Sequence, residues 1–84
     1  MADNYSYPLD ESWSTSEMTI VIKYFNAVED YYEKTASSDE EFASAYRAFK
    51  EVVPSIAEEK WLDREFEKAS GYSCYQARKT ILGK

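Results

Sequence analysis

The hydrophobic residues between positions 14 and 34 recur at intervals of three and four, which is the spacing of an α-helix. One stripe lies along a single helical face: Met18, Val21, Ile22, Phe25, Val28 and Tyr32. A second stripe lies beside it: Ile20, Tyr24, Ala27 and Tyr31. An ordinary surface helix needs only one such stripe. We therefore predict that this helix is central and that other elements cover it on two sides.

Four serines, each followed three residues later by Glu or Gln, precede amphipathic segments. The pairs are Ser14–Glu17, Ser38–Glu41, Ser55–Glu58 and Ser73–Gln76. In such a capping box the serine side chain and the Glu or Gln side chain each accept a hydrogen bond from a backbone N–H that the helix leaves unpaired. The four pairs predict helices at about 15–34, 39–53, 56–70 and 74–82. We expect Pro54 to end the second helix and Gly71 to supply the left-handed position after the third.

No segment alternates between apolar and polar residues with the period of a strand, so the predicted fold class is all-α. We expect residues 1–84 to form a single helical domain, a compact bundle of four helices. Residues 1–13 are predicted to form an extended arm that docks on the bundle, because they include Tyr5, Tyr7, Leu9 and Trp13. The other helices are expected to bury these stripes: Phe42, Ala45, Tyr46, Phe49, Val52 and Val53; Leu62, Phe66 and Ala69; Cys74, Ala77 and Ile81.

The composition lacks the residues on which several kinds of site depend. The 84 residues contain no His and a single Cys, Cys74, so a zinc or di-iron centre would lack its usual ligands and no intramolecular disulfide can form. We predict no cofactor and no metal. The chain begins without a basic and apolar leader and has no long apolar run, which favours a cytoplasmic protein without a membrane span.

The charge of −6 is unevenly distributed along the chain. Residues 1–67 contain all sixteen acidic residues and six basic ones, whereas residues 68–84 carry only four bases: Lys68, Arg78, Lys79 and Lys84. We expect this basic segment to lie against the acidic body of the same molecule. The alternative is an anion-binding or head-to-tail docking tail. The overall acidity argues against nucleic acid as the main partner.

Three carboxylates follow one another every four residues on the third predicted helix. Glu59, Asp63 and Glu67 could form a weak site for Mg²⁺ or Ca²⁺, which prefer oxygen ligands. Lys60, Arg64 and Lys68 form a neighbouring line, so we expect a solvated face of mixed charge instead. No catalytic residue is predicted. Cys74 has no His to act as a base and is interpreted as a buried small hydrophobic residue.

Trp61 is the hardest residue to assign to the core. It lies about 100° from the apolar stripe of its helix, by the angle between successive residues. Either the N-terminal arm covers it, or it is exposed and belongs to a protein–protein contact, where Trp is enriched. The predicted partner surface consists of Trp61, Ile56, Arg64, Arg78 and Lys79.

The segment 55–82 also has the outline of a helix-turn-helix. In that alternative, Gln76, Arg78 and Lys79 would face the DNA groove. The preceding helix is acidic and would face phosphate badly, so this hypothesis is the weaker one.

Several segments resemble a known protein family. They are Tyr7-Pro8-Leu9-Asp10, Trp13-Ser14-Thr15, Phe25-Asn26-Ala27-Val28-Glu29, Tyr46-Arg47-Ala48-Phe49-Lys50, Val53-Pro54-Ser55, Ala57-Glu58-Glu59-Lys60 and, between Phe66 and Tyr75, Ser70-Gly71-Tyr72-Ser73. This pattern is similar to the YktA-like uncharacterised protein family of Gram-positive bacteria. The resemblance implies a small cytoplasmic helical protein and brings no activity, substrate or functional residue.

We therefore expect a non-enzymatic interaction or regulatory module that binds an unknown protein or a second copy of itself. The alternatives are a helix-turn-helix-like nucleic-acid binder through residues 55–82 and a weak divalent-metal or hydrolase site on the third helix.

Overall fold

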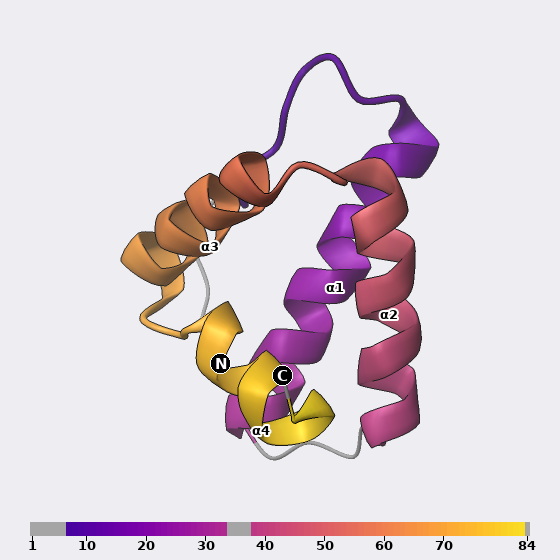
Figure 1. The fold of residues 1–84 in the computed structure, drawn as a ribbon. Coiled ribbons are helices and arrows are strands. Elements are labelled where there is room, and N and C mark those ends of the chain that lie inside the picture. Colours follow the sequence, from indigo (N-terminus) through magenta and orange to yellow (C-terminus); the bar gives the residue numbers. More distant parts are fainter. Residues whose placement is uncertain (1–6, 34–37, 84) are drawn as a thin grey trace.

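The computed structural model describes residues 7–33 and 38–83, and four helices account for most of them. They are α1 (Thr15–Glu33), α2 (Asp39–Val52), α3 (Ile56–Ser70) and α4 (Cys74–Leu82) (Figure 1). The described residues contain no strand. The predicted all-α fold and its four helices are confirmed, with boundaries within one residue of the predicted ones wherever the structure describes them.

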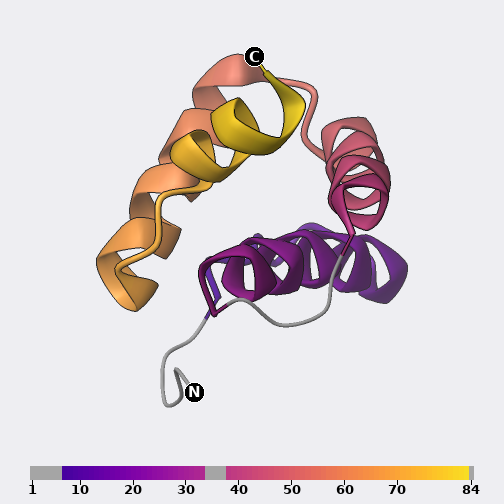
Figure 2. The ribbon, with the colours of Figure 1, turned by 90° about the horizontal axis from the view of Figure 1, so that it is seen from below.

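The helices α1 and α2 run side by side, and α4 packs against both of them (Figures 1 and 2). The helix α3 lies next to α4, and it reaches α1 through large side chains. The rings of Phe25 on α1 and Phe66 on α3 stack with centroids 4.5 Å apart. The central helix is therefore contacted from several sides, as its two apolar stripes require.

Serine side chains begin all four helices. The hydroxyls of Ser14, Ser38, Ser55 and Ser73 each accept a hydrogen bond from the backbone N–H three residues later. The return bond that completes a capping box is present where the third residue is Glu17 or Glu41. At the other end of α3, Gly71 adopts φ 82°, a conformation that costs glycine little because it has no Cβ.

The core is aromatic. Its buried side chains are Trp13, Val21, Tyr24, Phe25, Val28, Phe42, Phe49, Val53, Leu62, Phe66, Cys74 and Ala77. Tyr24 lies at its centre and stacks on Phe49 with ring centroids 4.4 Å apart. Aromatic pairs of this kind contribute about 0.5–1.5 kcal/mol beyond the area that they bury. The buried Cys74 agrees with its interpretation as a small core residue.

The segment before α1 contributes to this core. Tyr7 stacks against both Phe25 and Phe66, and its hydroxyl lies within hydrogen-bond distance of two acceptors on α1, the side-chain oxygens of Asn26 and Glu29. Leu9 is partly buried against the same cluster. The predicted arm also includes residues 1–6, Tyr5 among them, which lie outside the described residues.

One predicted core position is wrong. Ala69 of α3 is exposed, and the buried face of this helix instead includes Glu59 with Leu62 and Phe66. The apolar pattern could not predict that Glu59 is buried. A carboxylate replaces an apolar side chain inside a protein only when other side chains pair with it, and the pattern does not show those partners.

The α2 cap provides a direct test of the sequence signal. We expect Ser38→Ala to lower the free energy of unfolding by about 1 kcal/mol, because the N–H of Glu41 loses its acceptor. Urea denaturation followed by circular dichroism measures this change. Ser44→Ala is the matched control, since Ser44 is an exposed position inside the same helix. Equal losses in the two variants would show that the cap contributes nothing.

Candidate functional site

The guanidinium of Arg78 on α4 lies at the centre of a charged cluster. Its Nη1 and Nη2 donate to the two carboxylate oxygens of Asp63 on α3, over 3.2 and 3.0 Å. Nη1 also donates to the hydroxyl of Tyr24 on α1, over 2.9 Å. The Arg78 side chain is 13% exposed, so this paired geometry is largely shielded from water. Burial by itself would lower the pKa of Arg78, but the Asp63 and Tyr24 interactions raise it above its ordinary value.

Glu59 of α3 links the same cluster to α2. Its Oε1 accepts from the Lys50 ammonium over 2.7 Å, and its Oε2 accepts from the Tyr46 hydroxyl over 2.8 Å. Arg78 Nη1 lies 3.5 Å from the second oxygen. Two carboxylates thus face two cations, and among the described residues no buried side-chain polar atom lacks a partner. We call Tyr24, Tyr46, Lys50, Glu59, Asp63 and Arg78 the Arg78 network.

Burial changes the proton affinity of groups around the network. It raises the pKa of the Asp63 carboxyl, against the opposing effect of the Arg78 hydrogen bonds. Burial also raises the pKa of the Cys74 thiol, and the Asp63 charge adds to this shift. A thiol must ionise to act as a nucleophile, so this environment suppresses the reactivity of Cys74.

The prediction of a solvated, mixed-charge face on α3 is wrong for Glu59 and Asp63. Their side chains are 8% and 15% exposed and pair with other helices, whereas Glu67 is exposed. Asp63 pairs with no base among the described residues of its own helix and instead makes the bidentate contact with Arg78. The spacing along α3 could not show this, because both competing cations, Lys50 and Arg78, come from other helices.

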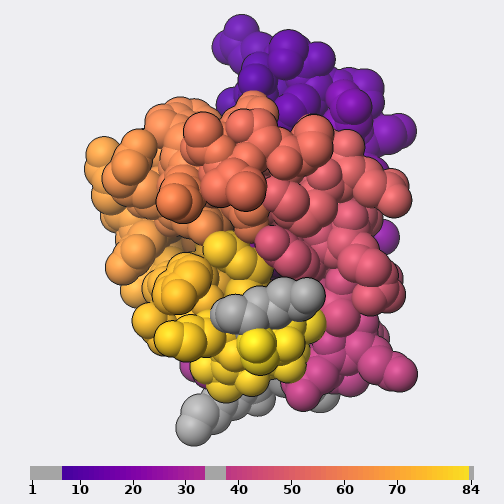
Figure 3. Space-filling view, in the orientation of Figure 1, coloured from indigo at the N-terminus to yellow at the C-terminus, as the bar shows by residue number. Residues whose placement is uncertain are grey.

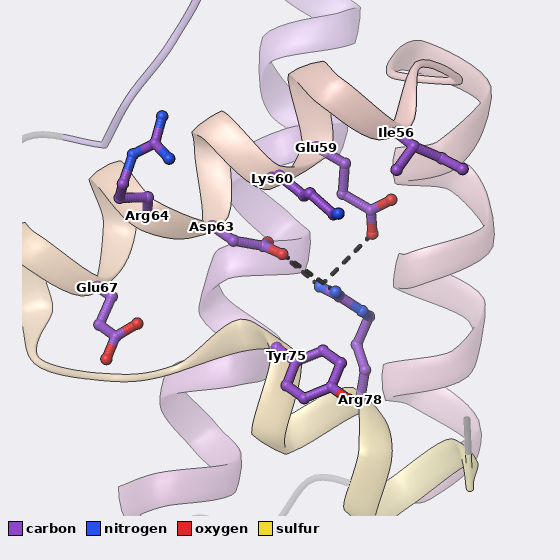
Figure 4. A pocket seen from close by; sticks show the side chains of 8 residues that line it. All are labelled: Ile56, Glu59, Lys60, Asp63, Arg64, Glu67, Tyr75 and Arg78. Carbon is purple, nitrogen blue, oxygen red and sulfur yellow. Dashed lines mark hydrogen bonds and ion pairs between the residues drawn. The ribbon is translucent and has the colours of Figure 1, made fainter.

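A pocket of ≈ 380 Å³ opens between α3 and α4, directly over the network. Its lining residues, which we call the α3/α4 groove, are Ile56, Glu59, Lys60, Asp63, Arg64, Glu67, Tyr75 and Arg78 (Figure 4). Figure 4 shows Arg78 reaching from α4 toward Asp63 and Glu59, with the Tyr75 ring beside it. The two helices share one face of the molecule (Figure 3). Buried ion pairs therefore form the floor of the groove, and exposed side chains form its rim.

The structure brings only part of the predicted partner surface together. Ile56 and Arg64 line the groove and are exposed. Arg78 also lines it, but its guanidinium faces the protein interior, so it is not a free surface cation. Lys79 is exposed outside the lining set, with its ammonium 5.9 Å from the centroid of the Tyr75 ring.

Trp61 is exposed, at 43%, and does not line the groove. Of the two alternatives for this residue, the exposed one describes the observed side chain. Tyr75 is not among the predicted surface residues, yet it is 50% exposed and lines the groove. The sequence contains a signal for this exposure. Tyr75 follows Cys74 directly, so its side chain points about 100° away from the buried Cys74 side chain on the helix.

The same contacts bear on the other two hypotheses. Arg78, one of the three residues expected to read DNA, has its donors directed at Asp63 and Tyr24. The oxygens of Glu59 and Asp63 are engaged by protein cations, and no group of three or more carboxylate, thiol or imidazole residues suited to a metal occurs in residues 7–33 and 38–83. The predicted contact of the basic segment with the acidic body is present for Arg78.

Comparison with known proteins connects this chain to one family. Residues 4–84 match the model of an uncharacterised protein family, UPF0223. A UPF0223 protein of Lactococcus lactis subsp. cremoris is 54% identical over 81 residues, which are 96% of this chain and 86% of the relative. A UPF0223 protein of Streptococcus uberis is 53% identical over 77 residues, which are 92% of this chain and 83% of the relative. A Streptococcus agalactiae protein is 49% identical over 79 residues, 94% of this chain and 84% of the relative.

None of the helices in the described part of the chain is long and apolar enough to cross a membrane.

Removing the central cation should destabilise the fold strongly. We expect Arg78→Met to cost about 3–5 kcal/mol, because it leaves buried carboxylates unpaired. Arg47→Met removes an exposed arginine from α2 and should change stability by no more than about 0.5 kcal/mol. Urea denaturation measures both variants. Arg78→Lys keeps the charge but loses the paired donors, so it should fall between Arg78→Met and the wild-type protein. Equal effects of Arg78→Met and Arg47→Met would contradict a structural role for the network.

Tyr46 should make stability depend on pH under alkaline conditions. Burial and the hydrogen bond to Glu59 raise the pKa of Tyr46 from 10.0 to about 12. The folded state therefore holds a proton that the unfolded chain loses near pH 10, so the contribution of Tyr46 to stability is complete below pH 10 and is lost as the pH rises through 12. We expect the unfolding free energy of Tyr46→Phe to fall less steeply over this interval. Parallel pH curves for the variant and the wild-type protein would refute the assignment.

Proposed function

Because the chain belongs to the uncharacterised protein family UPF0223, whose description names no activity, we propose its function from the surface alone: it is a small non-enzymatic interaction module. The docking surface is the α3/α4 groove with Ile56 at one end and Tyr75 on α4. A partner protein inserts an apolar side chain between them.

The observation that carries this proposal is the exposure of two large apolar side chains that line the α3/α4 groove. Ile56 is 67% exposed and Tyr75 is 50% exposed. Single exposed apolar residues are common on soluble proteins, but these two line the same pocket. Tyrosine is enriched among the residues that contribute most to binding between proteins. A partner that covers both side chains gains the free energy of removing them from water.

The charges near the groove support a role without catalysis. General acid–base catalysis depends on a group that can exchange a proton near the working pH. The Glu59 and Asp63 carboxylates are held by Lys50 and Arg78, and the Cys74 thiol is buried with a raised pKa. These contacts suit a rigid, charge-balanced floor beneath a binding surface.

Trp61 and Arg64 extend the proposed surface along α3. They are three residues apart, so their side chains are neighbours on the helix. Arg64 lines the groove, and Trp61 is exposed but is not among the lining residues. The proposal therefore keeps four residues of the predicted surface: Trp61, Ile56, Arg64 and Lys79. Tyr75 replaces Arg78, the fifth.

Three further predictions belong to this proposal. The protein acts in the cytoplasm, its family is the YktA-like family of Gram-positive bacteria, and its partner is another protein or a second copy of the chain. Its acidic composition favours a protein over a nucleic acid.

Site-specific photo-crosslinking tests the docking surface. The photoreactive residue p-benzoylphenylalanine replaces Tyr75 in the full chain, expressed in cells of the source organism. We expect one discrete crosslinked product, identified by mass spectrometry, that disappears when Ile56→Lys is added. A folded Ile56→Lys protein is confirmed beforehand by circular dichroism, and it should fold because Ile56 is exposed.

The matched control places the same photoreactive residue at Gln76. This position is exposed on the same helix but does not line the groove. Identical products at positions 75 and 76, or no product at either, would overturn the proposed surface. Turnover of a metabolite by the purified protein, abolished by Asp63→Asn in a protein that still folds, would overturn the non-enzymatic assignment.

A further inference from the structure

We propose that the α3/α4 groove recognises an acidic segment of its partner protein, in which carboxylates flank one apolar or aromatic side chain. This inference rests on the proposed docking function and specifies the chemistry of what docks. It is carried by the charges that remain on the rim after the Arg78 network is paired.

The rim of the groove carries more free cations than anions. The network is balanced, because Glu59 and Asp63 face Lys50 and Arg78. Lys60 and Arg64 are exposed and form no ion pair with any other residue in the described part of the chain, and the only unpaired acid in the lining is Glu67. A positive rim therefore occurs on a chain whose net charge is −6.

Lys79 adds a third cation beside Tyr75, one of the two apolar side chains that line the groove. Its ammonium lies 5.9 Å from the centroid of the Tyr75 ring, and the Arg78 guanidinium lies 6.0 Å from the same centroid. Cations at this distance attract the face of an aromatic ring. They help to hold Tyr75 at the groove, where one ligand can contact a ring and a positive charge together.

The shape of the groove suits a single anchoring side chain. A volume of ≈ 380 Å³ is at the lower end of the range of roughly 300–1,000 Å³ for ligand pockets. Ile56 on α3 and Tyr75 on α4 offer apolar contacts for the anchor (Figure 4). Arg64 points away from the Arg78 guanidinium in Figure 4, so it lies where it can meet a carboxylate beyond the anchor. Complementary charges of this kind direct association and select the partner.

Nucleic acid fits this surface less well than an acidic peptide. The exposed Glu67 lies in the lining itself, and Glu58 lies in the first turn of α3. A polyphosphate backbone would meet these acids along its length, whereas a short peptide can place its carboxylates at the cations alone.

A nuclear magnetic resonance titration of the full chain tests the inference. The probe is a synthetic peptide with a central Phe flanked on each side by Glu residues, and the comparison peptide has Lys in place of every Glu. We expect the Glu peptide to shift the amide signals of Lys60, Arg64 and Tyr75, with an affinity that falls as salt is added. The Lys peptide should shift them at least tenfold less at equal concentration. Equal shifts with both peptides, or tighter binding of a single-stranded oligonucleotide, would refute the charge preference.

Charge-reversal variants separate the surface from nonspecific attraction. Lys60→Glu with Arg64→Glu should abolish binding of the Glu peptide and allow binding of the Lys peptide. The matched control, Lys23→Glu with Arg47→Glu, changes the net charge equally at exposed positions on α1 and α2 and should bind as the wild-type protein does. Equal losses in the two double variants would overturn the inference.

The failure of this inference can be distinguished from failure of the docking function. If the photo-crosslink at Tyr75 survives Lys60→Glu with Arg64→Glu but is lost with Ile56→Lys, the groove docks a partner that is not acidic. If it is lost with neither, the docking function fails as well. The crosslinked product can also be a second copy of this chain, because α2 begins with the exposed acids Asp39, Glu40 and Glu41. That result would show self-association and would overturn the inference of a different partner protein.

Discussion

One guanidinium group connects the four helices. Arg78 of α4 pairs with Asp63 of α3, donates to Tyr24 of α1, and reaches α2 through Glu59. A chain of 84 residues buries only about 60–65% of its unfolded surface, so each contact between helices is a large part of what holds them in place. A buried ion pair adds little net stability compared with apolar packing, but removing one member is costly. The network therefore fixes the arrangement of the helices more than it strengthens the core.

This constraint also shapes the proposed site. The same carboxylates that join α3 to α2 and α4 form the floor of the groove, so the floor is both rigid and electrically neutral. The character of the surface is then decided by exposed residues that contribute little to the fold, such as Lys60, Arg64 and Tyr75. The paired side chains of the floor hold the helices together, whereas the exposed side chains of the rim are the ones proposed to bind the partner. Variants of the rim can change binding while the protein remains folded, whereas variants of Arg78 affect both.

Much of the fold could be predicted because its signals are local. A serine at the start of a helix acts on a backbone N–H three residues away, so Ser38 and its counterparts marked the beginnings of the helices. Hydrophobic periodicity likewise identified α1 as the central helix, since two adjacent stripes need two sides of cover. The wrong predictions concern residues that can be either buried or exposed, depending on their neighbours from other helices. Ala69 was expected inside and is exposed, and Glu59 was expected outside and is buried.

The sequence by itself determined an all-α chain with four capped helices, an aromatic core, and a composition with no His and a single Cys. These properties depend on residue types and on spacings shorter than one helix. Only the tertiary structure decided that Asp63 pairs with Arg78, fifteen residues away, and that Tyr75 and Ile56 line one groove. Such pairings depend on how the helices pack, because spacing along one helix cannot show which charge a neighbouring helix presents. Burial then converts an ordinary surface pair into a fixed one, since in a water-poor interior a charge without its partner costs several kcal/mol.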